Sequence, residues 1–422
     1  MLALEAEKSE GADSGERIVR SPSIFAEPKG RGAKAAARAA AVAQQARRLQ
    51  RQFDFGALNP LVSDADTLKL SPGVSIEITK IFRLADLPFI GDSALGTSQL
   101  SYSDPNLKGL VPLTLSVGAE IMAEVARLVM PNRQLVAIDD LVCRRMVAFR
   151  KGALKLFVLA ERVASGVPKC AAVKVQLRDE TPDGEYTWPV MEATFMLRDK
   201  LRGGRPLAVE PLVRPRTVHW SGRDIYPLRL CCGKRLRGIQ FVETWSESGL
   251  DYEVAMPPSA GNVKSTQFPL WGVNPLLMET VVSGFQLWRS HEKFAGAFGF
   301  PFRLRRMDFN GVLPKEGATL KCYLRLTGVT PKSQICDISV SDGNGKELVS
   351  VSGWEELTER VPTGYRELIL QPATTFLTDA ISAEVLGNPS TDVSSAYVVE
   401  PPYGVFERNE ELWLKTLSHV IL

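Results

Sequence analysis

An internal repeat restricts the fold of this 422-residue chain more than any other feature of its sequence. The tripeptide RRM occurs at residues 144–146 and again at residues 305–307. Each copy follows an apolar, helix-like segment that opens with a proline, Pro112 in the first half and Pro275 in the second. The landmarks keep the same order at a separation of about 160 residues, which indicates two similar supersecondary units in one chain.

Strand signals follow each RRM copy. Alternating apolar segments begin at Leu154 (LKLFVLAERV) and at Leu320 (LKCYLRLTGV). Each half then contains a predicted hairpin, with its turn at 182–184 in the first half and at 343–345 in the second. A helix can bury its apolar face on a curved antiparallel sheet, and two such units can pair edge to edge. The pattern therefore predicts an α+β fold, a tandem (double) hotdog in which two curved antiparallel sheets each wrap a central helix.

The composition excludes several classes of protein. Hydrophobic residues make up 45% and charged residues 23% of the chain, which is typical of a globular protein with a substantial core. The net charge of +3 gives no argument for a nucleic-acid partner, and no apolar run is long enough to span a membrane. The six cysteines form no C-x-x-C pair, so neither a zinc cage nor a disulfide framework fits. We therefore expect a reducing, cytoplasmic location.

Composition along the chain predicts four segments. Residues 1–56 are polar and then Ala-rich and basic, which predicts a disordered leader followed by a linker helix. The first hotdog is expected at 57–213 and the second at 214–361, while 362–422 form a C-terminal extension. The basic helix could contact RNA, a membrane or an acidic partner, although a solvated linker is the simpler interpretation.

Five segments resemble the dehydratase domains of polyketide and polyunsaturated-fatty-acid synthases. In the first half, LPFIGDSALG from Leu87 and GLVP from Gly109 resemble the segment that presents the family's catalytic histidine. In the second half, the similar segments are YPLRLCCGKRLRGIQ from Tyr226, VNPLLMETVVSGFQLW from Val273 and GWEELTERVP from Gly353. The resemblance implies a double hotdog that acts on, or binds, 3-hydroxyacyl chains carried by an acyl carrier protein.

The residues that carry chemistry in that family are replaced in this chain. The position of the catalytic histidine falls on Ser93, or on Asp92 in a stricter alignment, and that of the catalytic aspartate falls on Glu279. The aspartate's partner one turn later falls on Ser283, and the histidine of the F-H-G-P motif falls on Cys232. The same resemblance assigns substrate contacts to Cys232, Ser283, Gly96, Pro112 and Tyr226.

These replacements bear on the family's reaction, a β-elimination in which a neutral histidine removes the C2 proton and a carboxylic acid protonates the leaving hydroxyl group. A serine hydroxyl is no base without an activating neighbour, and no histidine precedes His219 in the chain. Glu279 could replace the aspartate as proton donor, with the proton displaced by one extra methylene. The sequence therefore predicts a dehydratase-like domain that is catalytically degenerate and has a scaffold or docking role.

Two alternatives remain open. An active acyl-carrier-linked dehydratase or isomerase would use Glu279 together with Asp92, and a hotdog thioesterase, which fits the motifs less well, would act on acyl-coenzyme A. His219, His291 and the Cys231–Cys232 pair are candidate reactive groups, but a surface or buried structural role accounts for each of them. The expected partners are acyl carrier protein, other synthase modules and a second copy in a homodimer. We expect no nucleic acid, no metal, no membrane span and no cofactor beyond the carrier's phosphopantetheine arm.

Overall fold

The computed structural model describes residues 56–94, 111–180, 188–201, 203–226, 229–230, 232–290, 297–330 and 332–360. The chain divides into two compact units, Met1–Gln52 and Phe53–Leu422, and all of the described residues lie in the second. The predicted linker helix, the first hairpin turn and the C-terminal extension lie outside the described residues, as do Gly96, Cys231 and His291. The division into four segments therefore stays a prediction.

The first hotdog is built from strands that surround the long helix α3 (Leu115–Val129). Thr114 caps the start of this helix, because its side chain accepts a hydrogen bond from the Val117 N–H at 3.4 Å. Pro112, which was expected to open the helix, lies ahead of it and pairs with Ala148 in an isolated bridge. The other elements are β1 (Thr67–Ser71), β2 (Ser75–Arg83), α2 (Pro88–Gly91), β3 (Gln134–Cys143), β4 (Ala153–Val163), β5 (Ala171–Asp179) and β6 (Met191–Arg198).

The second hotdog repeats this plan around α5 (Pro275–Arg289). Pro275 occupies the first helical position, where its missing N–H leaves no bond unmade, and the Asn274 side chain accepts from the Leu277 N–H at 3.1 Å. None of the described helices is long and apolar enough to cross a membrane. The other elements are β7 (Arg216–Ser221), α4 (Gly222–Ile225), the 3-10 turn η1 (Lys234–Leu236), β8 (Ile239–Ser246), β9 (Gly249–Ala255), β10 (Ala297–Phe309), β11 (Thr319–Val329), β12 (Ser333–Ser341) and β13 (Glu347–Arg360).

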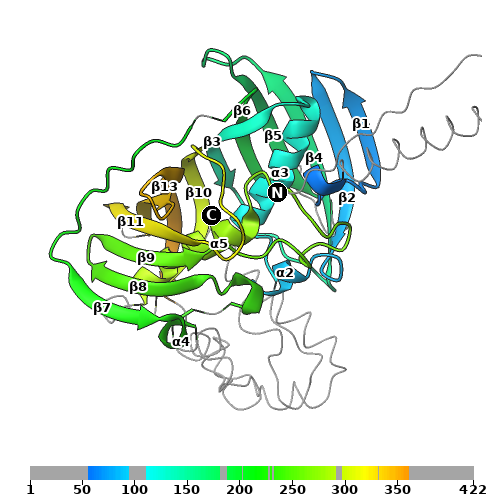
Figure 1. Cartoon of the computed structure of the whole chain (residues 1–422). Coiled ribbons are helices and arrows are strands. Elements are labelled where there is room, and N and C mark those ends of the chain that lie inside the picture. The colour runs from blue at the N-terminus through cyan, green and yellow to red at the C-terminus, as the bar shows by residue number, and fades with distance from the viewer. Residues whose placement is uncertain are drawn as a thin grey trace, which may run out of the picture. The chain divides into compact units, whose positions relative to one another are not determined.

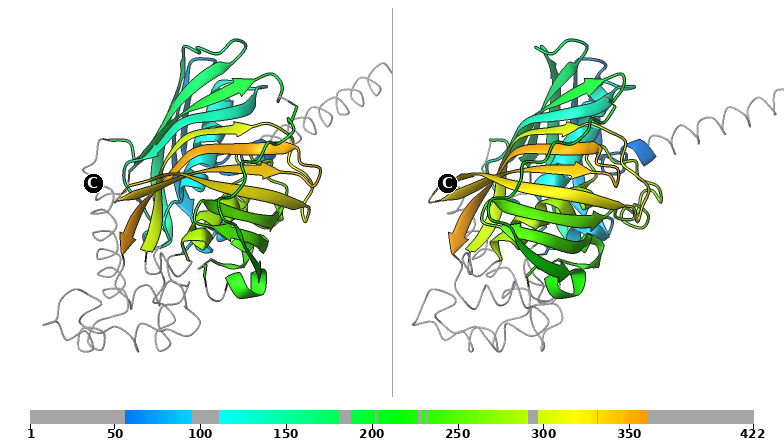
Figure 2. Two further views of the ribbon diagram at one scale, coloured as in Figure 1. Left: turned by 90° about the vertical axis from the view of Figure 1, so that its left-hand side faces the viewer. Right: turned by 60° about the vertical axis from the view of Figure 1, so that its left-hand side comes forward.

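In the described part of the chain, the strands form a 13-stranded antiparallel sheet (Figure 1). Its order is β1-β2-β4-β5-β6-β3-β10-β13-β12-β11-β9-β8-β7, which reads the same way outward from the central β3–β10 pair, with β7 as an additional edge strand. Each half of the sheet curves around its own helix (Figure 2). The predicted fold class of two curved sheets, each wrapping a central helix, is confirmed, and the halves pair edge to edge.

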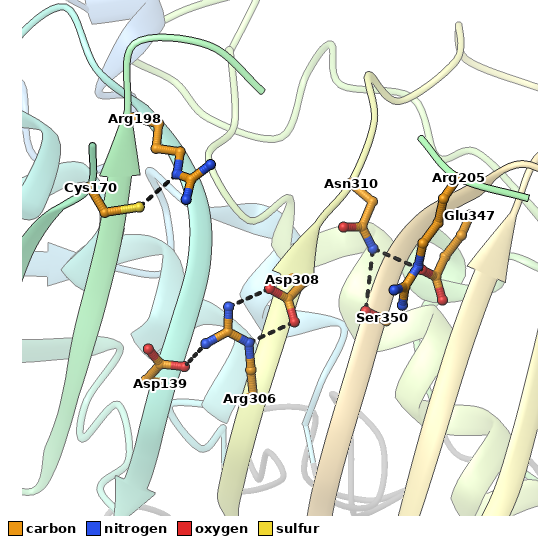
Figure 3. Close-up of polar contacts among 9 residues, drawn as sticks. All are labelled: Asp139, Cys170, Arg198, Arg205, Arg306, Asp308, Asn310, Glu347 and Ser350. Atoms are coloured by element: carbon orange, nitrogen blue, oxygen red, sulfur yellow. Dashed lines mark hydrogen bonds and ion pairs between the residues drawn. The ribbon is translucent and has the colours of Figure 1, made fainter. Parts of the chain in front are cut away.

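The sheet supports an internal duplication, but the RRM tripeptide does not mark it. The repeat predicts that its two copies occupy equivalent strand positions. This is wrong, because residues 144–146 follow the end of β3 and residues 305–307 lie inside β10. In β10, Arg306 joins the two halves, because its guanidinium donates to Asp139 of β3 at 2.6 Å and also to Asp308 of its own strand (Figure 3). The equivalent landmarks are instead the strands themselves, such as β4 with β11 and β5 with β12.

Two buried carboxylates of α3 hold neighbouring backbone segments. Glu120 accepts hydrogen bonds from the N–H groups of residues 272–274, directly ahead of α5, at distances of 2.8, 2.5 and 3.1 Å. Glu124 accepts from the N–H groups of Leu61 and Val62 at 3.0–3.1 Å. Burial raises the pKa of Glu124 well above its ordinary value, and the neighbouring Glu120 adds to that shift. The position of the second central helix is therefore fixed in part by a carboxylate of the first.

Candidate functional site

A cavity of about 210 Å³ lies where the two hotdogs meet. The first hotdog contributes the turn after α2 and the segment ahead of α3, and the second contributes one face of α5 with parts of β10 and β13. The structure brings five of the sequence-predicted residues onto its wall, namely Ser93, Pro112, Cys232, Glu279 and Ser283. Much of the remaining wall is apolar and includes Phe300 and Trp354.

One face of α5 supplies the polar wall of this cavity. Glu279, Ser283 and Gln286 are four and three residues apart, so their side chains follow one another along a single face of the helix. They are the three residues of α5 that are not fully buried. All three line the cavity, so the helical repeat places a continuous polar stripe on its wall.

Glu279 is the residue best suited to acid chemistry in the cavity. Burial raises the pKa of its carboxyl group above the ordinary value for glutamate. A hydrogen bond with the Thr114 side chain lowers this pKa, and the nearby Glu356 raises it, but burial dominates. Glu279 therefore keeps its proton to a higher pH than an exposed glutamate does, which a proton donor to a leaving hydroxyl group requires.

The two serine hydroxyls of the cavity wall donate to the main chain. Ser93 Oγ donates to the carbonyl oxygen of Ile90 at 2.7 Å, and Ser283 Oγ donates to the carbonyl oxygen of Glu279, one helical turn back, at 2.6 Å. A serine becomes a nucleophile or a base only when a neighbouring group takes its proton. Among the described residues, both hydroxyls donate to carbonyl oxygens, which do not take a proton.

Asp92 does not line the cavity, although it precedes Ser93. Its carbonyl oxygen accepts from the Gly233 N–H at 2.7 Å, and its carboxylate accepts from the Arg235 N–H at 2.8 Å. A Cβ atom at Gly233 would overlap the Asp92 carboxyl group, so the close approach of the two segments depends on glycine there. Asp92 thus ties the first hotdog to the second, and a catalytic pair of Asp92 with Glu279 finds no support in this placement.

The other predicted substrate contacts divide between the cavity and the core. Cys232 lines the cavity, but Tyr226 does not. The Tyr226 hydroxyl accepts from the Ile239 N–H at 2.6 Å, and burial raises its pKa. Tyr226 therefore makes a structural contact with the start of β8. Gly96 lies outside the described residues.

Sequence reasoning missed three polar residues of the cavity, Thr114 ahead of α3, Gln286 on α5 and Glu356 on β13. Glu356 accepts from Arg289 Nη1 at 2.9 Å and from Trp354 Nε1 at 2.8 Å. Arg289 is fully buried and also donates to Gln286 Oε1 at 3.0 Å. The seven-residue spacing from Glu279 could have identified Gln286. No local signal marks Glu356, because its place depends on how β13 passes the helix.

His219 is the only histidine that the structure describes. It lies in the edge strand β7, with its ring 5.9 Å from that of Phe241, and it does not line the cavity. Within the described ranges, no group of histidine, cysteine, aspartate and glutamate side chains could hold a metal ion. The chemistry available to the cavity wall in these ranges is therefore that of carboxyl, hydroxyl, amide and thiol groups.

Comparisons with known proteins agree with this geometry. Residues 225–356 match the family described as the polyketide synthase dehydratase N-terminal domain. The fold is similar to a trans-AT PKS dehydratase domain from Brevibacillus brevis, with a TM-score of 0.52 and 14% identity over 72% of this chain and 99% of that one. It is also similar to the dehydratase domain from the CurK module of the Curacin polyketide synthase, with a TM-score of 0.52 and 12% identity over 72% of this chain and 98% of that one. No curated protein sequence matches significantly.

The fold and the cavity between its halves define a double hotdog of the dehydratase class. Residues 225–356 match the family model of the polyketide synthase dehydratase domain, and the resemblance read from the sequence is confirmed. Ser93 and Glu279, which the sequence resemblance assigns to the places of the family's catalytic histidine and aspartate, both line this cavity.

Proposed function

We propose that this dehydratase-like domain binds 3-hydroxyacyl chains that an acyl carrier protein presents on its phosphopantetheine arm, and that it dehydrates them weakly or not at all. Its role in a synthase is then that of a scaffold or docking domain. One observation carries the proposal: Ser93 and Glu279, from opposite hotdogs, face the same cavity, and only Glu279 is equipped for proton transfer. In this proposal, Glu279 retains the role of proton donor, whereas Ser93 replaces the family's general base.

Dehydration needs a base for the C2 proton and an acid for the C3 hydroxyl group in one concerted or stepwise elimination. The raised pKa of Glu279 suits it to the acid role. Ser93 is unsuited to the base role because its hydroxyl donates to the Ile90 carbonyl oxygen, and Asp92 is bonded to Gly233 and Arg235 outside the cavity wall. A positioned general base contributes about 10²–10⁴-fold to a rate, so its replacement removes that factor.

The cavity wall supports binding of an acyl chain independently of catalysis. Apolar side chains from both hotdogs line it, and burying methylene groups against them is favourable. Acyl carrier protein and neighbouring synthase modules are the proposed partners, and a cytoplasmic location and homodimer formation belong to the same proposal. No cofactor is required, because the carrier's phosphopantetheine arm delivers the thioester.

A carrier-protein assay tests the proposal. A 3-hydroxyacyl carrier protein is incubated with the full chain or with Glu279→Ala, and formation of the 2-enoyl product is followed by mass spectrometry. Binding of the carrier-linked substrate is measured in parallel. We expect binding without appreciable product in either protein. Robust turnover that Glu279→Ala abolishes would establish an active, rewired dehydratase and overturn the degenerate-site proposal.

A rescue experiment sharpens this test. The double variant Ser93→His plus Glu279→Asp restores the residue types of the family, so we expect it to gain dehydration by about 10²-fold or more over the unmodified chain. The single variant Ser93→Ala is the matched control and should gain nothing. If the unmodified chain does not bind the acyl carrier substrate at all, the binding part of the proposal fails.

A further inference from the structure

The cavity contains polar groups that the elimination reaction does not use. Gln286 and Glu356 both line it, whereas the proton donor of the proposed site is Glu279. Gln286 lies seven residues beyond Glu279 on the same face of α5, and a helix rises 1.5 Å per residue, so the two are on the order of 10 Å apart along the helix axis. The polar lining therefore extends well past the place where a reacting hydroxyl group would meet Glu279.

The hydrogen bonds of Gln286 determine which way its amide group points. Its Oε1 atom accepts from Arg289 Nη1 at 3.0 Å and from the Gly299 N–H at 3.4 Å. A guanidinium and a main-chain N–H only donate, so the oxygen must face them and the Nε2 group must face away. Among the described residues, Nε2 has no hydrogen-bond acceptor from the protein, which leaves a donor at the cavity wall.

Glu356 supplies the matching acceptor. Its Oε1 atom accepts from Trp354 Nε1 at 2.8 Å, and its Oε2 atom accepts from Arg289 Nη1 at 2.9 Å. A carboxylate has about four lone-pair sites, so each oxygen can accept a further hydrogen bond. The Glu356 side chain is only 4% exposed, so solvent gives it little compensation. A cavity occupant is therefore in a position to complete the hydrogen bonding of both Glu356 and Gln286.

We propose that Gln286 and Glu356 form a subsite for a second hydroxyl group, farther along the acyl chain than the one that meets Glu279. A hydroxyl group donates to Glu356 and accepts from Gln286 Nε2 at the same time. A fully reduced hydrocarbon chain would leave Gln286 Nε2 and the remaining lone pairs of Glu356 without partners beneath an apolar ligand, which is unfavourable. An ammonium group would satisfy Glu356 alone. The substrate class is thus a chain that is oxygenated at two places, and this inference rests on the proposed acyl-binding function.

A matched pair of ligands tests the subsite. Both are pantetheine thioesters of 3-hydroxyacyl chains with equal length, and one carries an additional hydroxyl group near its distal end. Their dissociation constants for the full chain are measured by titration calorimetry. A hydrogen bond to a charged group favours the dihydroxy ligand by about 10- to 100-fold. Equal affinities, or tighter binding of the monohydroxy ligand, would overturn the subsite and leave the proposed function intact.

Variants show whether the named residues cause the preference. Gln286→Met keeps the length of the side chain and removes the amide donor but leaves Glu356 in place, so it should reduce the preference for the dihydroxy ligand by about threefold or more while monohydroxy binding is retained. Gln240→Met, at an exposed position of β8, is the matched control and should keep the full preference. A preference that is undiminished in Gln286→Met overturns the assignment. If neither ligand binds the unmodified chain, the proposed function itself fails, and circular dichroism of each variant verifies its fold.

Discussion

Helices α3 and α5 hold equivalent places in the two hotdogs, but they use their polar residues in opposite ways. In α3, Glu120 and Glu124 are fully buried and accept hydrogen bonds from main-chain N–H groups. In α5, Glu279 and Gln286 face a cavity instead. A carboxylate that is saturated by the main chain braces the fold, whereas a carboxyl group on a cavity wall is available to a ligand. The duplicated fold therefore contains a bracing helix, α3, whose carboxylates hold neighbouring backbone segments, and a site helix, α5, whose polar residues line the cavity.

Removal of a bracing carboxylate should have the largest effect on stability. Glu120→Ala leaves three main-chain N–H groups ahead of α5 without their acceptor and removes the ion pair with Arg127, whose Nη2 lies 3.6 Å from Glu120 Oε1. We expect it to lower the free energy of unfolding by about 3–5 kcal/mol. Glu279→Ala should lower it by about 1 kcal/mol or less, because the side chain faces a cavity. Urea unfolding monitored by circular dichroism measures both.

A conservative variant controls this comparison. Glu120→Gln keeps one acceptor oxygen, so it should retain part of the stability that Glu120→Ala loses. The distinction between a bracing helix and a site helix would be broken if Glu120→Ala and Glu279→Ala cost the same free energy of unfolding. It would also be broken if Glu120→Ala abolished acyl binding in a protein that is still fully folded.

Two contacts between the hotdogs, one made by Asp92 and one by Asp86, should also differ in their contribution to the free energy of unfolding, by a smaller amount. Asp92 receives the Arg235 N–H and its side chain is 18% exposed, whereas Asp86 forms an exposed ion pair with Lys264 and is 44% exposed. Asp92→Ala should lower the free energy of unfolding by about 1–2 kcal/mol, because a partly buried N–H loses its charged acceptor. Asp86→Ala, the matched control, should cost about 0.5 kcal/mol or less. Equal costs would show that Asp92 adds nothing beyond an ordinary surface ion pair.

The sequence pattern predicted those elements of the fold whose conformation is set by neighbouring residues in the chain. The proline at the start of α5, the alternating strands and the Gly-Asn-Gly turn at 343–345 all lie where the sequence indicated. The RRM repeat was misleading because three letters carry no information about where a strand ends. β3 ends at Cys143, before the RRM copy at residues 144–146, whereas β10 continues past the copy at residues 305–307 to Phe309.

The cavity could be predicted only in part, for a related reason. Glu279, Ser283 and Ser93 all follow from the aligned motifs of the resemblance, so their placement on one wall was accessible to sequence reasoning. Glu356 is far from α5 in the sequence, and only the passage of β13 along that helix brings it to the wall. Asp92 turns from the cavity to Gly233 because the two hotdogs meet there, which no local pattern records.

The last expected effect concerns pH and compares one carboxyl group from each helix. Burial raises the pKa of both Glu279 and Glu124 above the ordinary value of 4.5, and raises that of Glu124 further. Between 4.5 and the raised pKa, the folded state binds more protons than the unfolded state, so the stabilisation that protonation gives is full at low pH and is lost as pH rises. The unmodified chain should therefore lose stability relative to Glu279→Gln as pH rises from 5 toward 8, by at most about 1.4 kcal/mol per pH unit.

Urea unfolding of the unmodified chain, Glu279→Gln and Glu124→Gln across this pH range measures the effect. The relative loss should extend to higher pH for Glu124, because its pKa is raised more and Glu120 lies beside it, whereas Glu279 is also bonded to Thr114, which lowers its pKa. A constant difference between the unmodified chain and Glu279→Gln would mean that Glu279 is ionised throughout. It would then not serve as the proton donor of the cavity, and the contrast between the two helices would rest on Gln286 alone.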